Sequence, residues 1–180
     1  MCGIVGAASA RNVVPVLIEG IRRLEYRGYD STGLAVLNAA EGTALTRLVS
    51  TARVADLDAQ ARARNIAGTT GISHPPWAPH AAPSPLNGHP HRSGNQIAVV
   101  HNGIIENFEA LRERLRAQGY VFNTQTDSET IAHLVHAHWH GAAHGDLLRA
   151  VQIAIAEFEG AYAIAVISSR PSSMETQNTR

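Results

Sequence analysis

The chain begins with Met1-Cys2-Gly3-Ile4-Val5-Gly6, and Cys2 is the only cysteine among its 180 residues. Removal of Met1 would expose a residue that carries a thiol and a free α-amino group together. The amine has an ordinary pKa of roughly 7.7–8.0 and the thiol about 8.5, so the amine can act as base for the thiol near neutral pH. A buried cysteine at the start of a strand is the alternative interpretation.

Composition excludes several classes of protein. Lys plus Arg number 15 and Asp plus Glu number 15, so no net charge attracts nucleic acid or a membrane surface. A single cysteine cannot form an internal disulfide, which favours the reducing cytoplasm. No apolar run reaches the ~18 residues that a membrane span needs. We therefore expect one cytoplasmic domain with a real core and without nucleic-acid or membrane partners.

Hydrophobic spacing predicts an alternation of strands with pairs of helices. Helical patterns cover residues 12–28, 54–64, 111–119, 126–138 and 146–160, and strand-length apolar runs cover residues 4–8, 33–37, 45–50, 68–74, 97–100 and 162–167. Asn12, Thr126 and Asp146 are suited to cap the helices that follow them. In the fourth helix, His138 is expected to face inward. Strands clustered with helix pairs favour a layered α+β fold over a doubly wound sheet.

Residues 75–94 contain six of the eight prolines, so neither helix nor strand is expected to persist there. Loops of this length are usually functional lids or disordered. The strand after this stretch delivers His101-Asn102-Gly103 at its end. An Asn amide and a Gly N–H are suited to hold an oxyanion, where one lost donor costs about 2.7–4 kcal/mol. A plain Asn-Gly turn is the alternative.

Several stretches together carry a resemblance to a known family. They are Met1-Cys2-Gly3-Ile4-Val5-Gly6, Arg23-Leu24-Glu25-Tyr26-Arg27-Gly28-Tyr29-Asp30-Ser31, His101-Asn102-Gly103-Ile104-Ile105-Glu106-Asn107, Thr126-Asp127-Ser128-Glu129 and Gly160-Ala161-Tyr162. Over about residues 1–170 the chain resembles the class II glutamine amidotransferases, glutaminases with an N-terminal nucleophile. The second stretch is similar to the amino-sugar-forming aminotransferases of that family.

The resemblance implies a four-layer αββα sandwich and a glutaminase reaction on L-glutamine. It implies that Cys2, once exposed, attacks the side-chain amide of glutamine and releases ammonia through a γ-glutamyl thioester. It also implies that Asn102 and Gly103 form the oxyanion hole. The ammonia would supply amino-sugar synthesis.

The same resemblance implies the groups that hold the substrate. Asp127 receives the α-ammonium of glutamine, as a carboxylate near a helix N-terminus stays ionised. Trp77 and His80 belong to the loop that closes over the substrate, and Arg27 orients the site. The stretch His89-Pro90-His91 braces this lid. No metal or organic cofactor is implied.

The lid is where the chain departs from the family. The family has Thr-Arg-Trp-Ala-Thr-His-Gly where this chain has Pro75-Pro76-Trp77-Ala78-Pro79-His80-Ala81. The arginine that clamps the α-carboxylate falls on Pro76, and a hydroxyl donor falls on Pro79. Truncating one side of a buried charge pair costs about 2–5 kcal/mol. At 1.4 kcal/mol per tenfold, that is roughly 30- to several-thousand-fold in glutamine recognition. We expect a severely impaired glutaminase.

Length is the second departure. Members of the amino-sugar branch continue with further strands and a sugar-phosphate isomerase region of two α/β domains. Residues 1–168 are therefore predicted to be an incomplete, C-terminally truncated glutaminase domain, with the isomerase domains absent. Residues 169–180, which are polar and aperiodic, are predicted to be a disordered tail. A sandwich without its later strands exposes an edge, which predicts self-association.

Four histidines at positions 133, 136, 140 and 144 recur at about one helical face. A metal site there is conceivable, because imidazole is a common ligand. No carboxylate or thiol lies among these histidines to complete such a site. A solvated helix edge is therefore the favoured interpretation.

Two other readings of the whole chain remain open. The first is a catalytically dead fragment or binding remnant that keeps the fold without the chemistry. The second is the related glutaminase of phosphoribosylpyrophosphate amidotransferase or of asparagine synthetase. The stretch Glu25-Tyr26-Arg27-Gly28-Tyr29-Asp30 argues against the second reading.

Overall fold

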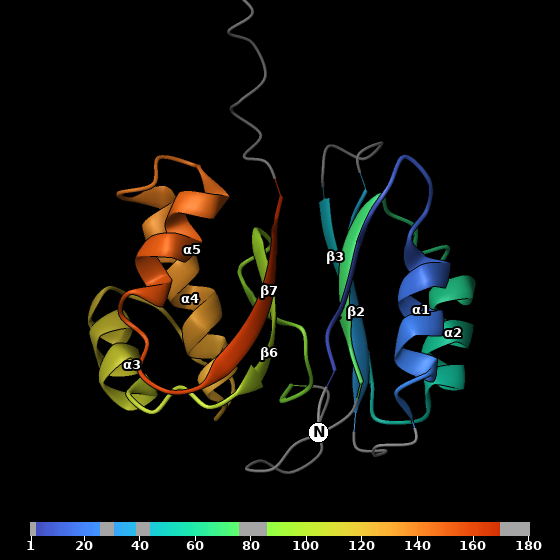
Figure 1. Ribbon diagram of the computed structural model, residues 1–180, viewed down its shortest axis with the longest axis horizontal. Helices are drawn as coiled ribbons and strands as arrows, with labels where there is room; N and C mark the ends of the chain where they lie inside the picture. The colour runs from blue at the N-terminus through green and yellow to red at the C-terminus, as the bar shows by residue number, and fades with distance from the viewer. Residues whose placement is uncertain (1–2, 26–30, 39–43, 76–85, 170–180) are drawn as a thin grey trace, which may run out of the picture.

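The computed structural model describes residues 3–25, 31–38, 44–75 and 86–169. Its elements, in chain order, are β1 (Val5–Ala8), α1 (Val14–Arg22), β2 (Thr32–Asn38), β3 (Ala44–Ser50), α2 (Val54–Ala63), β4 (Thr70–His74), β5 (His91–Ser93), β6 (Ile97–Gly103), α3 (Phe108–Ala117), α4 (Asp127–His140), α5 (Leu147–Ile155) and β7 (Tyr162–Ser168). Figure 1 shows four layers: α1 with α2, two facing sheets, and α3 to α5. The predicted α+β sandwich of αββα type is confirmed.

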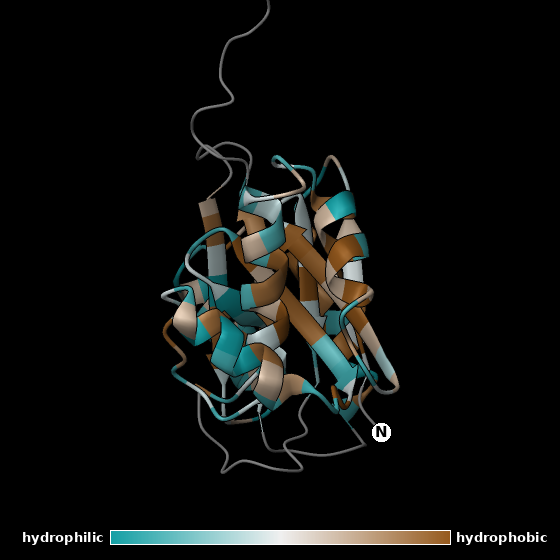
Figure 2. Ribbon diagram, turned by 90° about the vertical axis from the view of Figure 1, so that its left-hand side faces the viewer, coloured by the Kyte–Doolittle hydropathy of each residue, from teal (hydrophilic) through white to brown (hydrophobic). Residues whose placement is uncertain are grey.

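Both sheets are antiparallel, with strand orders β1-β4-β2-β3 and β5-β6-β7. Alternate residues of a strand point to opposite faces of its sheet. In β2, Leu34 and Val36 accordingly pack beneath α1 and α2, whereas Ala35 faces the other sheet. In β6, Ala98 and Val100 face the same inter-sheet layer. Figure 2 shows hydrophobic residues, in brown, along strands that lie behind the helices.

The layer between the two sheets mixes alanines with branched apolar side chains. Its buried members are Ala35, Ile72, Ala98, Val100 and Ile167. Polar residues near the ends of β4 and β6 meet across this layer, which sets the position of the site described below.

Two of the three predicted caps are present, whereas Val13 rather than Asn12 occupies the cap position of α1. The Thr126 hydroxyl accepts a hydrogen bond from the Glu129 N–H, and the Asp146 carboxylate accepts one from the Arg149 N–H. Asn12 lies one residue before the cap position of α1, and its Oδ1 accepts from the N–H of Val14 at 3.1 Å. These bonds occupy backbone donors that a helix start leaves unpaired.

Four expectations about the elements are wrong. Residues 91–93, inside the proline-rich stretch, form β5, because they pair with β6. The first helix ends at Arg22 rather than Gly28, and the last ends at Ile155 rather than Gly160. His138 is only half-buried.

Within the described residues, no helix is long and apolar enough to cross a membrane.

Candidate active site

The end of β6 carries the predicted oxyanion donors to the edge of the second sheet. Asn102 pairs with Ala163 of β7, and Gly103 pairs with Tyr162. Gly103 has a φ of +114°, and a Cβ atom there would lie 2.1 Å from the carbonyl oxygen of Ala161. Glycine is required at this position. The strand therefore ends at an exposed glycine, whose backbone conformation a larger residue could not adopt.

His74, the last residue of β4, holds the side chain of Asn102 from the opposite sheet. Its Nε2 lies 2.7 Å from Asn102 Oδ1, and His74 is 2% exposed. Because Oδ1 can only accept, the imidazole Nε2–H is the donor. This contact occupies the amide oxygen and leaves the amide NH₂ group to donate elsewhere. An oxyanion hole needs a donor with a fixed direction of this kind.

Asp127 begins α4, where the unpaired N–H groups of the helix favour negative charge. Its Oδ2 accepts a hydrogen bond from the backbone N–H of Ile105 at 3.0 Å. Its Oδ1 accepts from the Ser128 hydroxyl at 3.3 Å and lies 3.6 Å from His101 Nδ1. The side chain keeps 20% of its surface exposed. The carboxylate is thus fixed in direction and still accessible to a cation.

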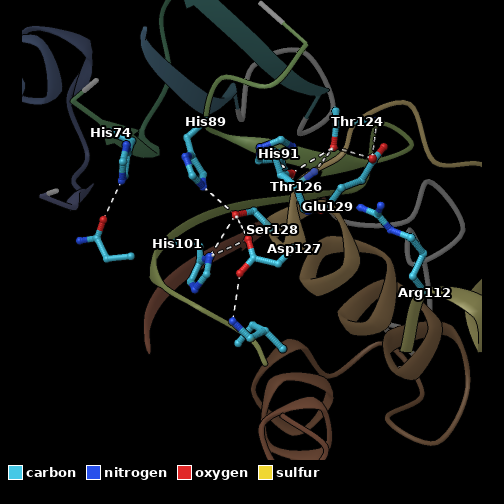
Figure 3. Close-up of polar contacts among 12 residues, drawn as sticks. His74, His89, His91, His101, Arg112, Thr124, Thr126, Asp127, Ser128 and Glu129 are labelled. Atoms are coloured by element: carbon cyan, nitrogen blue, oxygen red, sulfur yellow. Dashed lines mark hydrogen bonds and ion pairs between the residues drawn. The ribbon is translucent and has the colours of Figure 1, made fainter. Parts of the chain in front are cut away.

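Ser128 connects Asp127 to the imidazoles of the half-buried His89 and the buried His101, as Figure 3 shows. Its Oγ lies 3.0 Å from His89 Nε2 and 3.0 Å from His101 Nδ1. A hydroxyl has one hydrogen, which here goes to Asp127, so both imidazole nitrogens must donate to it. The tautomers of His89 and His101 are fixed as a result. The His89 ring also lies 4.4 Å from the His74 ring.

Burial keeps this group of histidines uncharged. It lowers the pKa of His74, although the bond to Asn102 acts in the opposite direction. Burial, followed by the charges of neighbouring histidines, lowers the pKa of His89 well below its ordinary value. Burial lowers the pKa of His101 against the opposing charge of Asp127. Neutral imidazoles do not compete with a ligand's ammonium group for Asp127.

The segment before α4 is fastened by Glu129. Its Oε1 accepts from the Asn123 N–H at 3.0 Å, and its Oε2 accepts from the Thr124 N–H at 2.7 Å. The predicted capping box is therefore half formed, because the carboxylate binds residues 123–124 rather than the N–H of Thr126. The Thr126 hydroxyl also lies 3.2 Å from Nε2 of the buried His91. These contacts hold the start of α4, and with it Asp127, against β5.

The structure brings three of the predicted site residues into one region. Residues 101–105 carry Asn102 and Gly103 and bond to Asp127 through the N–H of Ile105. Cys2, Arg27, Trp77 and His80 lie outside the described residues, as do Pro76 and Pro79. Their roles, and the roles of the three described residues toward glutamine, remain predictions.

Sequence reasoning missed His74 and Ser128. His74 ends a predicted strand immediately before the prolines, and a polar residue at a strand end is a usable signal. Ser128 was quoted within the capping motif, but nothing in the sequence shows that two imidazoles reach it. Both roles arise from contacts between segments 27 or more residues apart. His91 is buried and His89 is half-buried, with its ring bonded to Ser128 of α4, and bracing of the lid stays a prediction.

The expected solvated helix edge is wrong for two of its histidines. His133 is buried, and its ring nitrogens lie 2.9 Å from Ser93 Oγ and 3.2 Å from the Val121 carbonyl oxygen. Burial, followed by the charges of His140 and His133, lowers the pKa of His136 to about 4. His140 and His144 are exposed, as expected.

A cavity of about 660 Å³ lies over α1 and α2 and does not include the residues of the candidate site. Its rim carries ion pairs of Arg22 and Arg62 with Asp58. These charges already satisfy one another, and surface pairs of this kind are worth little. Fixed donor and acceptor geometry, rather than cavity size, therefore assigns the candidate site to the region of Asn102 and Asp127.

Comparison with known proteins identifies the family. The model of the glutamine amidotransferase domain family matches residues 85–177, more than half of the chain. The chain belongs to this family. The glutamine phosphoribosylpyrophosphate amidotransferase of B. subtilis, solved with ADP and GMP, has a TM-score of 0.70 and 25% identity over 93% of this chain and 35% of its own. An allosteric regulatory enzyme of purine biosynthesis has a TM-score of 0.72, also with 25% identity.

Curated relatives are more similar in sequence. The glutamine–fructose-6-phosphate aminotransferases (isomerizing) of Idiomarina loihiensis and Pseudomonas aeruginosa are each 52% identical to this chain over 94% of it, and that of Acidithiobacillus ferridurans is 54% identical. The match covers 27% of each relative. The chain thus spans about a quarter of the length of these aminotransferases, and the resemblance to their glutaminase region is confirmed.

Proposed function

We propose that this glutamine amidotransferase domain hydrolyses L-glutamine to glutamate and ammonia, with Cys2 as nucleophile, and that the ammonia supplies amino-sugar synthesis. The observation that carries the proposal is the fixed amide of Asn102. The amide oxygen of Asn102 is hydrogen-bonded to His74. Asn102 lies near the end of β6, and the backbone N–H of Ile105, just beyond this strand, donates to Asp127. These contacts support the roles that we propose for Asn102, as an oxyanion donor, and for Asp127, as the acceptor of the substrate ammonium group.

The proposed reaction has two steps, formation of a thioester and its hydrolysis. The α-amino group of Cys2 takes the thiol proton, and the sulfur forms a bond to the side-chain amide carbon of glutamine. The amide of Asn102 and the N–H of Gly103 donate to the resulting oxyanion. When this intermediate collapses, the carbon–nitrogen bond breaks and ammonia leaves with the proton. Water then attacks the thioester, releases glutamate and restores the thiol.

We further propose that recognition of glutamine is weakened by the prolines of the lid. Pro76 occupies the position at which the family has its carboxylate-clamping arginine. The expected loss is roughly 30- to several-thousand-fold in kcat/KM, from about 2–5 kcal/mol for an unpaired charge. Pro76→Arg is expected to recover part of this loss by lowering KM, because it restores a cation without changing the nucleophile.

The test of the function is glutamate formation by the purified chain after Met1 is removed. Turnover above that of Cys2→Ala, and reduced in Asn102→Ala, supports a glutaminase. Turnover equal to that of Cys2→Ala rejects it. The second candidate, a remnant that keeps the fold without the chemistry, is favoured by the prolines. It predicts that millimolar glutamine does not raise the melting temperature of the chain.

We place the domain at residues 1–168 and in the cytoplasm, the latter because a single cysteine suits a reducing compartment. The aminotransferase and isomerase reactions named for the relatives are not assigned to this chain. L-glutamine is the proposed small-molecule partner, and the chain itself is a proposed partner through the edge of its sheet.

A further inference from the structure

Two imidazoles at the end of α4 converge on one oxygen atom. His136 Nε2 and His140 Nε2 each lie 2.9 Å from Gln96 Oε1. The two histidines are four residues apart, which places them on one face of the helix, and their ring centroids are 4.5 Å apart. Gln96 immediately precedes β6. Two imidazoles of α4 and one side-chain amide of the segment before β6 thus meet at one point.

We propose that this point binds a single divalent transition-metal ion of the class of Zn²⁺, Ni²⁺ or Cu²⁺. The protein donors are His136 Nε2, His140 Nε2 and Gln96 Oε1, and water completes the coordination. Imidazole nitrogen binds these ions at about 2.0–2.1 Å for zinc. The ion lies between the two Nε2 atoms and Gln96 Oε1, in place of the hydrogens that the imidazoles now donate to that oxygen.

The other ring nitrogen of His136, Nδ1, already has a hydrogen-bond partner. His136 Nδ1 lies 2.8 Å from the Tyr120 hydroxyl. Without metal, Nε2–H donates to Gln96 and Nδ1 accepts from Tyr120. With metal, the Nε2 lone pair binds the ion, and the proton resides on Nδ1 and is donated to the Tyr120 oxygen. Metal-bound histidines almost always donate their other N–H to such an acceptor. The imidazole stays neutral in both states.

The position of the pair on α4 favours a cation. His136 and His140 lie in the last turns of α4, which ends at His140. Unpaired carbonyl groups give a helix C-terminus a partial negative charge that stabilises cations. His133, one turn earlier, is held by Ser93 and Val121 and is not free to bind the ion.

The site differs from the usual closed metal centre. Within residues that the structure describes, no group of three or more His, Cys, Asp or Glu side chains could hold an ion. Two imidazoles and one amide oxygen predict reversible binding in the micromolar range rather than a permanently bound structural ion. Binding would join the end of α4 to the segment before β6, which also holds the end of β7 because the Ser169 N–H donates to the Gln96 carbonyl at 2.8 Å. The expected consequence is a higher melting temperature.

The test is titration of the full chain, without any histidine tag, with ZnCl₂ and with NiCl₂ by calorimetry. Cys2→Ala serves as the background, so that the thiol contributes nothing and the result is independent of the glutaminase proposal. We expect one ion per chain. His140→Ala, an exposed position, should weaken binding about tenfold or more, equivalent to 1.4 kcal/mol. Tyr120→Phe should weaken it by about tenfold or more, as loss of an acceptor to a ligand typically does.

The matched control is His144→Ala, an exposed histidine beyond the end of α4, which should bind as tightly as the background. A second readout is the fluorescence of Trp139, whose ring lies 5.0 Å from that of His140. In Trp77→Phe, Cu²⁺ should quench Trp139, and His140→Ala should abolish this quenching. Unchanged affinity in His140→Ala, or an equal loss in His144→Ala, would overturn the proposal.

Discussion

At the residue scale, the direction of one amide group carries the proposed chemistry. Asn102 can rotate its side chain by half a turn and exchange oxygen for nitrogen. The His74 Nε2–H at 2.7 Å favours one of the two orientations. His74 is thus a positioning residue, which acts on substrate through Asn102.

His74→Leu should lower kcat about 100-fold while changing KM little, because removal of an oxyanion donor costs about 10²–10³ in kcat. His74→Gln, whose amide N–H can still donate to Asn102 Oδ1, should recover part of the loss. Steady-state glutaminase kinetics measure both values. A His74→Leu enzyme with unchanged kcat would show that Asn102 needs no partner.

Ser128 is expected to act on binding rather than on turnover. Its hydroxyl donates to Asp127, the proposed acceptor of the substrate ammonium. Ser128→Ala removes a hydrogen bond to a charged group, worth about 1.5–3 kcal/mol, and should raise KM for glutamine about tenfold with little change in kcat. Ser128→Thr keeps the hydroxyl and serves as the matched control. Equal effects of both substitutions would assign Ser128 a packing role instead.

At the element scale, the start of α4 depends on one buried carboxylate. Burial raises the pKa of Glu129, but the His133 imidazole and the bonds from Asn123 and Thr124 outweigh it and lower the pKa from 4.5 to about 2. The folded chain therefore binds fewer protons than the unfolded chain between these values. Its stability is fully present above about pH 5 and is lost as pH falls toward 2.

Glu129→Gln should remove this pH dependence. At pH 6 the substitution should lower the free energy of unfolding by about 3 kcal/mol, because each pKa unit corresponds to 1.36 kcal/mol. The difference between wild type and variant should shrink as pH falls below 4.5. Urea unfolding at pH 6, 4 and 3 measures it. A difference that stays constant over this range would contradict the assignment.

The elements show which parts of the fold a sequence can predict. The continuous apolar run of β2, which is buried on both faces, and the helical spacing of α1, which buries one face, were both predictable. Helix ends were not, because α1 and α5 end at Arg22 and Ile155, where no glycine or proline follows directly. β5 was missed because its three residues form a strand only by pairing with β6. Local proline content says nothing about a partner strand.

In the candidate site too, residues within local motifs were predictable, and residues that act through distant contacts were not. Asn102, Gly103 and Asp127 were predictable because a strand end and a helix start are readable motifs. His74 and Ser128 act through contacts between layers, which no single motif encodes. The prediction failed for His133 and His136 because Ser93 of β5 contacts the first, and Tyr120 and Gln96 contact the second. Sequence spacing within α4 does not show these partners.

At the scale of the whole molecule, the second sheet has an outer strand. β7 pairs with β6 on one side, and in the strand order of the described residues no strand pairs with its other side. Such edges template association between chains. We expect concentration-dependent self-association in sedimentation velocity. Ala163→Lys, on an exposed position of β7, should reduce it, whereas Ala142→Lys, exposed between α4 and α5, should not. A single monomeric species for the wild type at all concentrations would contradict this expectation.

The central claim is that a thiol at residue 2 works with the donors at the end of β6. The most direct measurement is the intact mass of the chain after reaction with an electrophile that mimics glutamine. The account predicts loss of Met1 and one label on Cys2, with slower labelling in Asn102→Ala and in excess glutamine. A retained Met1 with no label, or labelling that ignores both Asn102 and glutamine, would contradict it.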